Sequence, residues 1–149
     1  MLNTSQTIAN DYWMEVLGIK RDRIPVLIIG NNPIEMTSIY NTLIEIRSKN
    51  YLADVCFDIK DSFDIIAKSK PEVIFIDDNL ILYDLKKLLR ILKQNARTKH
   101  IKIIALKSSN WNYHIIDDVD DYILKDAINA NILDRLIEKN LNPLKSQLA

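Results

Sequence analysis

Short apolar runs alternate with longer stretches of helical periodicity from Ile24 to Leu141. Two of the runs, Val73–Ile76 and Ile101–Leu106, are nearly continuous and rich in β-branched residues, which is typical of strands buried on both faces of a parallel sheet. Helices are predicted between the runs, where apolar residues recur every three or four positions. The predicted strands are Pro25–Ile29, Ala53–Ile59, Glu72–Ile76, Ile101–Leu106 and Asp121–Leu124, and the predicted helices are 33–49, 62–68, 82–96 and 127–141.

Five strands that alternate with helices predict an α/β fold with an open parallel sheet and right-handed crossovers. We predict the flavodoxin-like strand order 2-1-3-4-5 for this sheet. A further amphipathic helix is predicted at residues 7–18, where Ile8, Tyr12 and Val16 share one face. We hypothesise that this helix docks on the domain or on a second copy, which would give a homodimer. The expected division is an N-terminal helical extension at 1–22, one domain at 23–141 and a tail at 142–149.

The composition limits the classes of function. The 149 residues include 20 basic and 20 acidic side chains, so the formal charge is zero and a nucleic-acid partner is not expected. The apolar runs, such as Val26–Ile29, are too short to cross a bilayer, and the start does not resemble a secretory signal, so a cytoplasmic protein is expected. The single cysteine, Cys56, and two histidines have no zinc-ligand spacing, so we expect no cofactor.

Several strings resemble the response-regulator receiver family of bacterial signalling. Lys70–Asp77 (KPEVIFID) resembles the third strand of that family, which ends in the phosphoacceptor aspartate. Leu88–Lys93 and Ile101–Leu106 resemble its third helix and fourth strand, and Asp120–Lys125 resembles its fifth strand and lysine. The resemblance covers Ile24–Leu141 and implies a CheY-like domain. In that family the aspartate accepts a phosphoryl group from a histidine kinase, with Mg²⁺ held by an acidic pair.

The resemblance can be followed position by position. Asp77 matches the phosphoacceptor, Lys125 the lysine that binds phosphoryl oxygens, and Tyr122 the switch aromatic. Three other positions depart from the family pattern. The acidic pair is replaced by Gly30 and Asn31 (Asn31 and Asn32 if the frame is shifted by one), the hydroxyl position is Lys107 with Ser108 just beyond it, and the proline after the lysine is Asp126.

These departures predict a site that binds Mg²⁺ weakly at best, because Mg²⁺ prefers carboxylate oxygens in octahedral geometry. Asp77 and Asp78 are the carboxylates left for it, and Asn32 before Pro33 is better interpreted as a helix cap than as a ligand. Lys107 could place a second ammonium beside Lys125 and favour the Asp77 carboxylate without a phosphoryl group. We therefore predict poor or absent phosphorylation.

The expected signalling face also departs from the family. Lys107 and Lys125 are 18 positions apart, several fewer than a receiver with a full fourth helix requires. We predict a shortened fourth helix that carries Trp111 and Tyr113. Aromatic residues are enriched at interface cores, so these two are candidate partner contacts.

Three functions remain open from the sequence. The leading hypothesis is a pseudo-receiver, which acts without enzyme activity through phosphorylation-independent contacts with another signalling protein, either a histidine kinase or an output protein. The second is a phosphorylatable response regulator that uses Asp77. The third is a small-ligand binder or enzyme on the same fold. Against the third, Gly30 is the only glycine after the N-terminal segment, so the chain lacks a glycine-rich phosphate loop.

Overall fold

The computed structural model describes residues 23–108 and 118–143. Their strands form one parallel five-stranded sheet in the order β2-β1-β3-β4-β5, which confirms the predicted flavodoxin-like order. In chain order the elements are β1 (Ile24–Ile29), α2 (Pro33–Ile44), β2 (Tyr51–Cys56), α3 (Ile59–Ser69), β3 (Val73–Asp77), α4 (Leu82–Gln94), β4 (Lys102–Lys107), β5 (Asp121–Leu124), the 3-10 helix η1 (Lys125–Ala127) and α5 (Ala130–Leu141).

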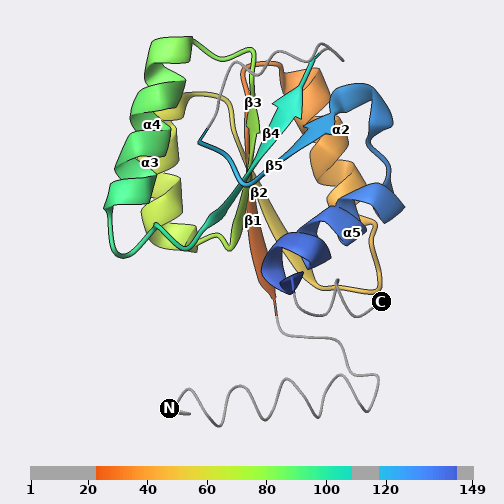
Figure 1. Ribbon diagram of the computed structural model, residues 1–149. Helices are drawn as coiled ribbons and strands as arrows, with labels where there is room; N and C mark the ends of the chain where they lie inside the picture. The colour runs from red at the N-terminus through yellow and green to blue at the C-terminus, as the bar shows by residue number, and fades with distance from the viewer. Residues whose placement is uncertain (1–22, 109–117, 144–149) are drawn as a thin grey trace, which may run out of the picture.

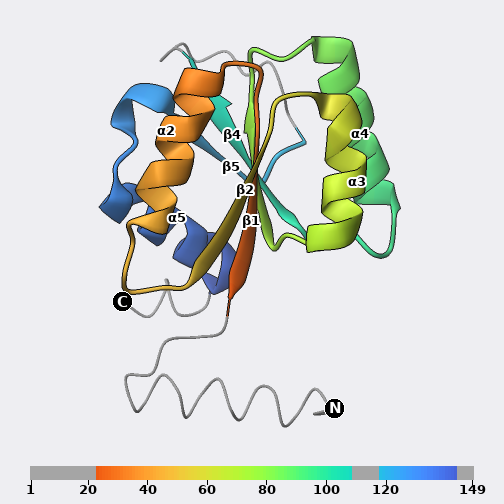
Figure 2. The ribbon, with the colours of Figure 1, turned by 180° about the vertical axis from the view of Figure 1, so that it is seen from behind.

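Helices cover both faces of the sheet, with α2 and α5 on one side and α3 and α4 on the other (Figures 1 and 2). Successive residues of a strand point to opposite faces, so each central strand contributes to two apolar clusters. In β1, Val26 and Ile28 pack beneath α2 and α5, whereas Leu27 and Ile29 pack beneath α3 and α4. Every residue of β3 is buried, as its continuous apolar pattern predicts.

The boundaries of several elements differ from the prediction. β2 begins at Tyr51 and ends at Cys56, not at Ile59, because the side chain of Asp58 accepts a hydrogen bond from the Lys60 amide and begins α3. α2 ends at Ile44, not near residue 49, since the chain must turn before Tyr51 pairs with the first residue of β1.

The last helix also begins later than predicted. η1 occupies Lys125–Ala127, and Asn129 then caps α5 by accepting a hydrogen bond from the Ile132 amide at 2.9 Å. The cap predicted at Asn32 is present, because its Oδ1 accepts hydrogen bonds from the amides of Ile34 and Glu35 at 3.1 and 3.2 Å.

Some predictions concern residues outside the described ranges. These are the helix at 7–18 and its docking, the shortened fourth helix, and the contacts of Trp111 and Tyr113. Within residues 23–108 and 118–143, none of the helices has the length and apolarity that a membrane span requires.

Candidate functional site

Asp77 is the last residue of β3 and lies at the carboxyl edge of the sheet, where ligands of such folds usually bind. Its side chain is 1% exposed, so a carboxylate is buried at the end of a strand whose other residues are all apolar. Oδ1 accepts a hydrogen bond from the Asn79 amide at 2.9 Å, and Oδ2 lies 2.8 Å from the Lys125 ammonium. Apart from that ion pair, Oδ2 has no hydrogen-bond partner among the described residues. The buried charge of Asp77 therefore depends on Lys125.

Lys125 follows β5 directly and is the first residue of η1. The side chain is 12% exposed and forms the ion pair with Asp77. The structure adds a second partner, because the Glu35 carboxylate lies 3.3 Å from the same ammonium. Lys125, directly after the edge strand β5, therefore links the end of the central strand β3 to α2.

Glu35 was not identified as a site residue from the sequence. It lies in the first turn of α2, beside the Asn32 cap, six residues after the end of β1. A helix that follows a parallel strand begins near the carboxyl edge of the sheet, so an acidic residue in its first turn is placed close to the strand ends. That position is the signal that could have identified Glu35.

The electrostatics of Lys125 reflect competing effects. Burial disfavours the charged ammonium and lowers its pKa, whereas the contacts with Asp77 and then Glu35 raise it. The two carboxylates prevail, so the pKa of Lys125 lies above its usual value. Lys125 therefore stays positively charged throughout the physiological pH range and remains bound by both carboxylates.

The three residues directly after β1, at positions 30–32, contribute no charge at this edge. Asn31 is exposed, and the Oδ1 of Asn32 is already engaged by the first two amides of α2. Gly30 packs against Met36, which is fully buried. A Cβ atom added at Gly30 would overlap the Met36 Sδ atom, so any side chain at this position would require Met36 to move.

The other predicted site residues make separate contacts. The Ser108 hydroxyl donates a hydrogen bond to Oδ1 of Asp78 at 3.1 Å, next to Asp77 along the chain. The Lys107 ammonium lies over the ring of Tyr122, 5.7 Å from its centroid. Tyr122 is half-buried on β5. The second ammonium expected beside Asp77, from Lys107, remains a prediction.

Two aspartates at the start of β5 have structural contacts. Asp120 accepts a hydrogen bond from the Ile103 amide at 2.8 Å and lies 3.4 Å from the Lys93 ammonium. Asp121 pairs with Lys139 at 3.3 Å. These two carboxylates link the start of β5 to β4, α4 and α5.

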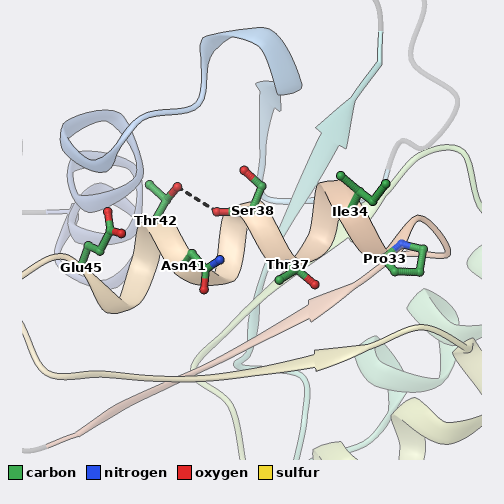
Figure 3. Close-up of a pocket in the computed structure, with 7 residues that line it drawn as sticks. All are labelled: Pro33, Ile34, Thr37, Ser38, Asn41, Thr42 and Glu45. Carbon is green, nitrogen blue, oxygen red and sulfur yellow. Dashed lines mark hydrogen bonds between the residues drawn. The ribbon is translucent and has the colours of Figure 1, made fainter.

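An open hollow runs along α2 (Figure 3). Its lining is mostly short polar side chains, and one of them, Thr42, donates a hydrogen bond to the carbonyl of Ser38 at 2.9 Å. The lining residues are Pro33, Ile34, Thr37, Ser38, Asn41, Thr42 and Glu45. Asp77, Glu35 and Lys125 are not among them, so this hollow is separate from the charged cluster.

No protein-family model matches the sequence, and no curated protein is significantly similar to it. Solved structures do match its fold. The chemotaxis response regulator CheY4 of Vibrio cholerae superimposes with a TM-score of 0.66 at 14% identity, covering 79% of this chain and 98% of its own. The phosphorylated cyanobacterial phytochrome response regulator RcpA gives a TM-score of 0.65 at 20% identity, with 81% and 96% of the two chains covered.

A third match is the receiver domain of the sensor histidine kinase PA1611 from Pseudomonas aeruginosa, which contains a magnesium ion coordinated in its active-site cleft. It gives a TM-score of 0.63 at 18% identity and covers 78% of this chain and 95% of its own. These similarities agree with the observed strand order. The chain therefore has the CheY-like fold of response-regulator receiver domains.

Proposed function

We propose that this chain is a pseudo-receiver, a signalling module that binds another protein without needing an aspartyl phosphate. The proposal is carried by one observation: the Lys125 ammonium is held between the carboxylates of Asp77, at 2.8 Å, and Glu35, at 3.3 Å. The internal cation already neutralises the buried Asp77 charge, so the folded domain needs neither a metal nor a phosphoryl group at this position.

The donor groups around Asp77 do not fit Mg²⁺. Both Asp77 oxygens are engaged, Oδ1 by the Asn79 amide and Oδ2 by Lys125. Gly30 and Asn31 supply no carboxylate. Mg²⁺ requires near-octahedral oxygen ligands and dehydrates reluctantly, so it would have to displace Lys125 without gaining an acidic pair in return.

Glu35 also disfavours a phosphoryl group at Asp77. The lysine that would bind phosphoryl oxygens, according to the family resemblance, is shared with this second carboxylate. Phosphorylation would replace the single negative charge of Asp77 by the two charges of an aspartyl phosphate, and Lys125, which would have to balance them, is already shared with Glu35.

Incubation with acetyl phosphate, with and without Mg²⁺, tests the proposal by intact-mass spectrometry. We expect no stoichiometric phosphoryl adduct under either condition. The matched control is Gly30→Asp/Asn31→Asp/Met36→Ala, which restores an acidic pair and removes the side chain that occupies its space. We expect this variant to gain Mg²⁺-dependent labelling that Asp77→Asn abolishes. Stoichiometric labelling of the wild type at Asp77 would refute the proposal.

A second candidate function is a phosphorylatable response regulator. It is favoured by the contact between Asp77 and Lys125, the two matches to the family pattern that the fold brings together. In this case Asp78 or Glu35 would have to help bind the metal. The same assay separates the two functions, because a phosphorylatable wild type would show labelling that requires Mg²⁺ and is lost in Asp77→Asn.

A further inference from the structure

The segment from α4 to the start of β4 carries a large share of the positive charge of the chain. Seven of the 20 Lys and Arg residues lie between positions 86 and 102, and no Asp or Glu occurs from 85 to 116. The whole chain has zero formal charge, so this segment is a local excess within a neutral protein. The seven residues are Lys86, Lys87, Arg90, Lys93, Arg97, Lys99 and Lys102.

α4 is strongly amphipathic, with apolar residues on one side and polar or charged residues on the other. Four leucines are buried against the sheet, namely Leu85, Leu88, Leu89 and Leu92. Residues three, four and seven positions apart share a side of a helix, so Tyr83, Lys87 and Arg90 lie together on the side opposite the leucines. Lys86 and Lys93 border them, and the exposed Arg97 and Lys99 follow the helix end. We call Lys86, Lys87, Arg90, Lys93, Arg97 and Lys99 the basic face of α4.

The basic face is poorly compensated within the protein. Among the residues that the structure describes, Lys93 is its only member in an ion pair, with Asp120 at 3.4 Å. Like charges at helical spacing, such as Lys86 and Arg90, repel each other. The arrangement is therefore slightly unfavourable for folding, and an acidic partner would relieve it.

Apolar side chains are exposed at the amino end of the same helix. Ile81 is 70% exposed and Tyr83 is 72% exposed, and Leu82 between them is also exposed. Tyrosine and arginine are enriched among the residues that dominate binding energy at protein interfaces. From Tyr83 to Lys93 the surface extends about 15 Å at the rise of an α-helix, which suits a short segment of a partner.

We propose that the basic face of α4, together with Ile81 and Tyr83, docks an acidic segment of another protein that carries an apolar anchor. The proposal deepens the proposed function, because it names the chemistry of the partner, but its test does not involve Asp77. The surface lies on the side of the sheet away from α2, which carries Glu35 (Figure 1).

The surroundings favour a protein over an extended polyanion. The neighbouring helix α3 and its cap carry the exposed Asp58, Asp61 and Asp64, and the exposed Asp118 and Asp120 precede β5 on the other side of α4. A nucleic-acid duplex or an anionic bilayer reaches well beyond α4 and would meet these carboxylates. An acidic segment of small footprint avoids them, so charge complementarity selects it.

Fluorescence anisotropy with a labelled peptide of alternating Glu and Leu residues tests the proposal at low and high salt. We expect salt-sensitive binding, amide NMR shifts concentrated on α4, and at least about tenfold weaker binding by Lys87→Glu/Arg90→Glu. The matched control, Lys60→Glu/Lys68→Glu on α3, reverses the same number of exposed charges and should bind like the wild type. Tyr83→Ala should weaken binding, and Asp77→Asn should leave it unchanged.

Several outcomes would overturn the proposal. One is equal binding of a peptide with Gln in place of Glu, and a second is equal loss of binding in the α3 control. Another is tighter binding of duplex DNA or phosphatidylserine vesicles than of the peptide, which would assign the surface to a polyanion. The last is self-association that Lys87→Glu/Arg90→Glu abolishes, which would identify a second copy as the occupant. Unchanged melting temperatures establish that both double variants are folded.

Discussion

Replacing Lys125 by methionine tests the electrostatic core of this account. The substitution preserves most of the apolar stem but removes the ammonium 2.8 Å from Oδ2 of Asp77, leaving a carboxylate that is 1% exposed with only the Asn79 amide as a donor. Breaking a buried ion pair by removing one partner costs about 3–5 kcal/mol. Glu35 is partly exposed and can be solvated, so we expect a loss near the lower end, about 3 kcal/mol.

The free energy of unfolding from urea titrations at neutral pH measures this loss. Replacing both partners, in Lys125→Met/Asp77→Asn, should recover most of it, because no buried charge is left unpaired. A deficit below about 1 kcal/mol that the added Asp77→Asn change does not reduce would refute the reasoning, because it is the behaviour of an exposed ion pair.

Three further predictions follow from individual contacts. Asp120→Ala removes the acceptor of the Ile103 amide, and should cost about 1–2 kcal/mol and accelerate hydrogen exchange at that amide. Tyr51→Phe removes the hydroxyl that donates to Asp134 at 2.6 Å, and should lower the free energy of unfolding by about 1–2 kcal/mol in urea titrations. The raised pKa of Lys125 means that its ion pairs contribute fully below the unfolded-state lysine pKa of about 10.4, and that this contribution is lost as pH rises through the folded-state value. Thermal melts should therefore show wild type losing more stability than Lys125→Met above about pH 10.4.

The fold could be predicted from the sequence where one physical signal dominates. β3 and β4 contain nearly continuous apolar runs, which is the pattern that a strand buried on both faces of a sheet produces. The predicted end of β2 was wrong because Phe57 continues the apolar run of the strand in the sequence. In the structure Phe57 is exposed, and Asp58 already caps α3. The Asp58 helix cap sets the end of β2, and the hydrophobic pattern alone does not reveal it.

The candidate site could be predicted only in part. Asp77 and Lys125 follow strands whose ends share one edge of a parallel sheet, so their proximity is implied by the strand order. Glu35 was missed although its position in the first turn of the helix after β1 places it near the strand ends, because its contact with Lys125 also depends on how α2 packs over the sheet. The occupation of the space at Gly30 by Met36 is likewise a packing result that only the folded structure contains.

A magnesium titration followed by amide NMR tests the central claim most directly. The Asn79 amide donates to Oδ1 of Asp77, so its resonance reports any ion that reaches this carboxylate. We predict that millimolar Mg²⁺ leaves this resonance unshifted in the wild type and shifts it in Gly30→Asp/Asn31→Asp/Met36→Ala. A saturable shift in the wild type that Asp77→Asn removes would contradict the claim that Lys125, shared between Asp77 and Glu35, takes the place of a metal.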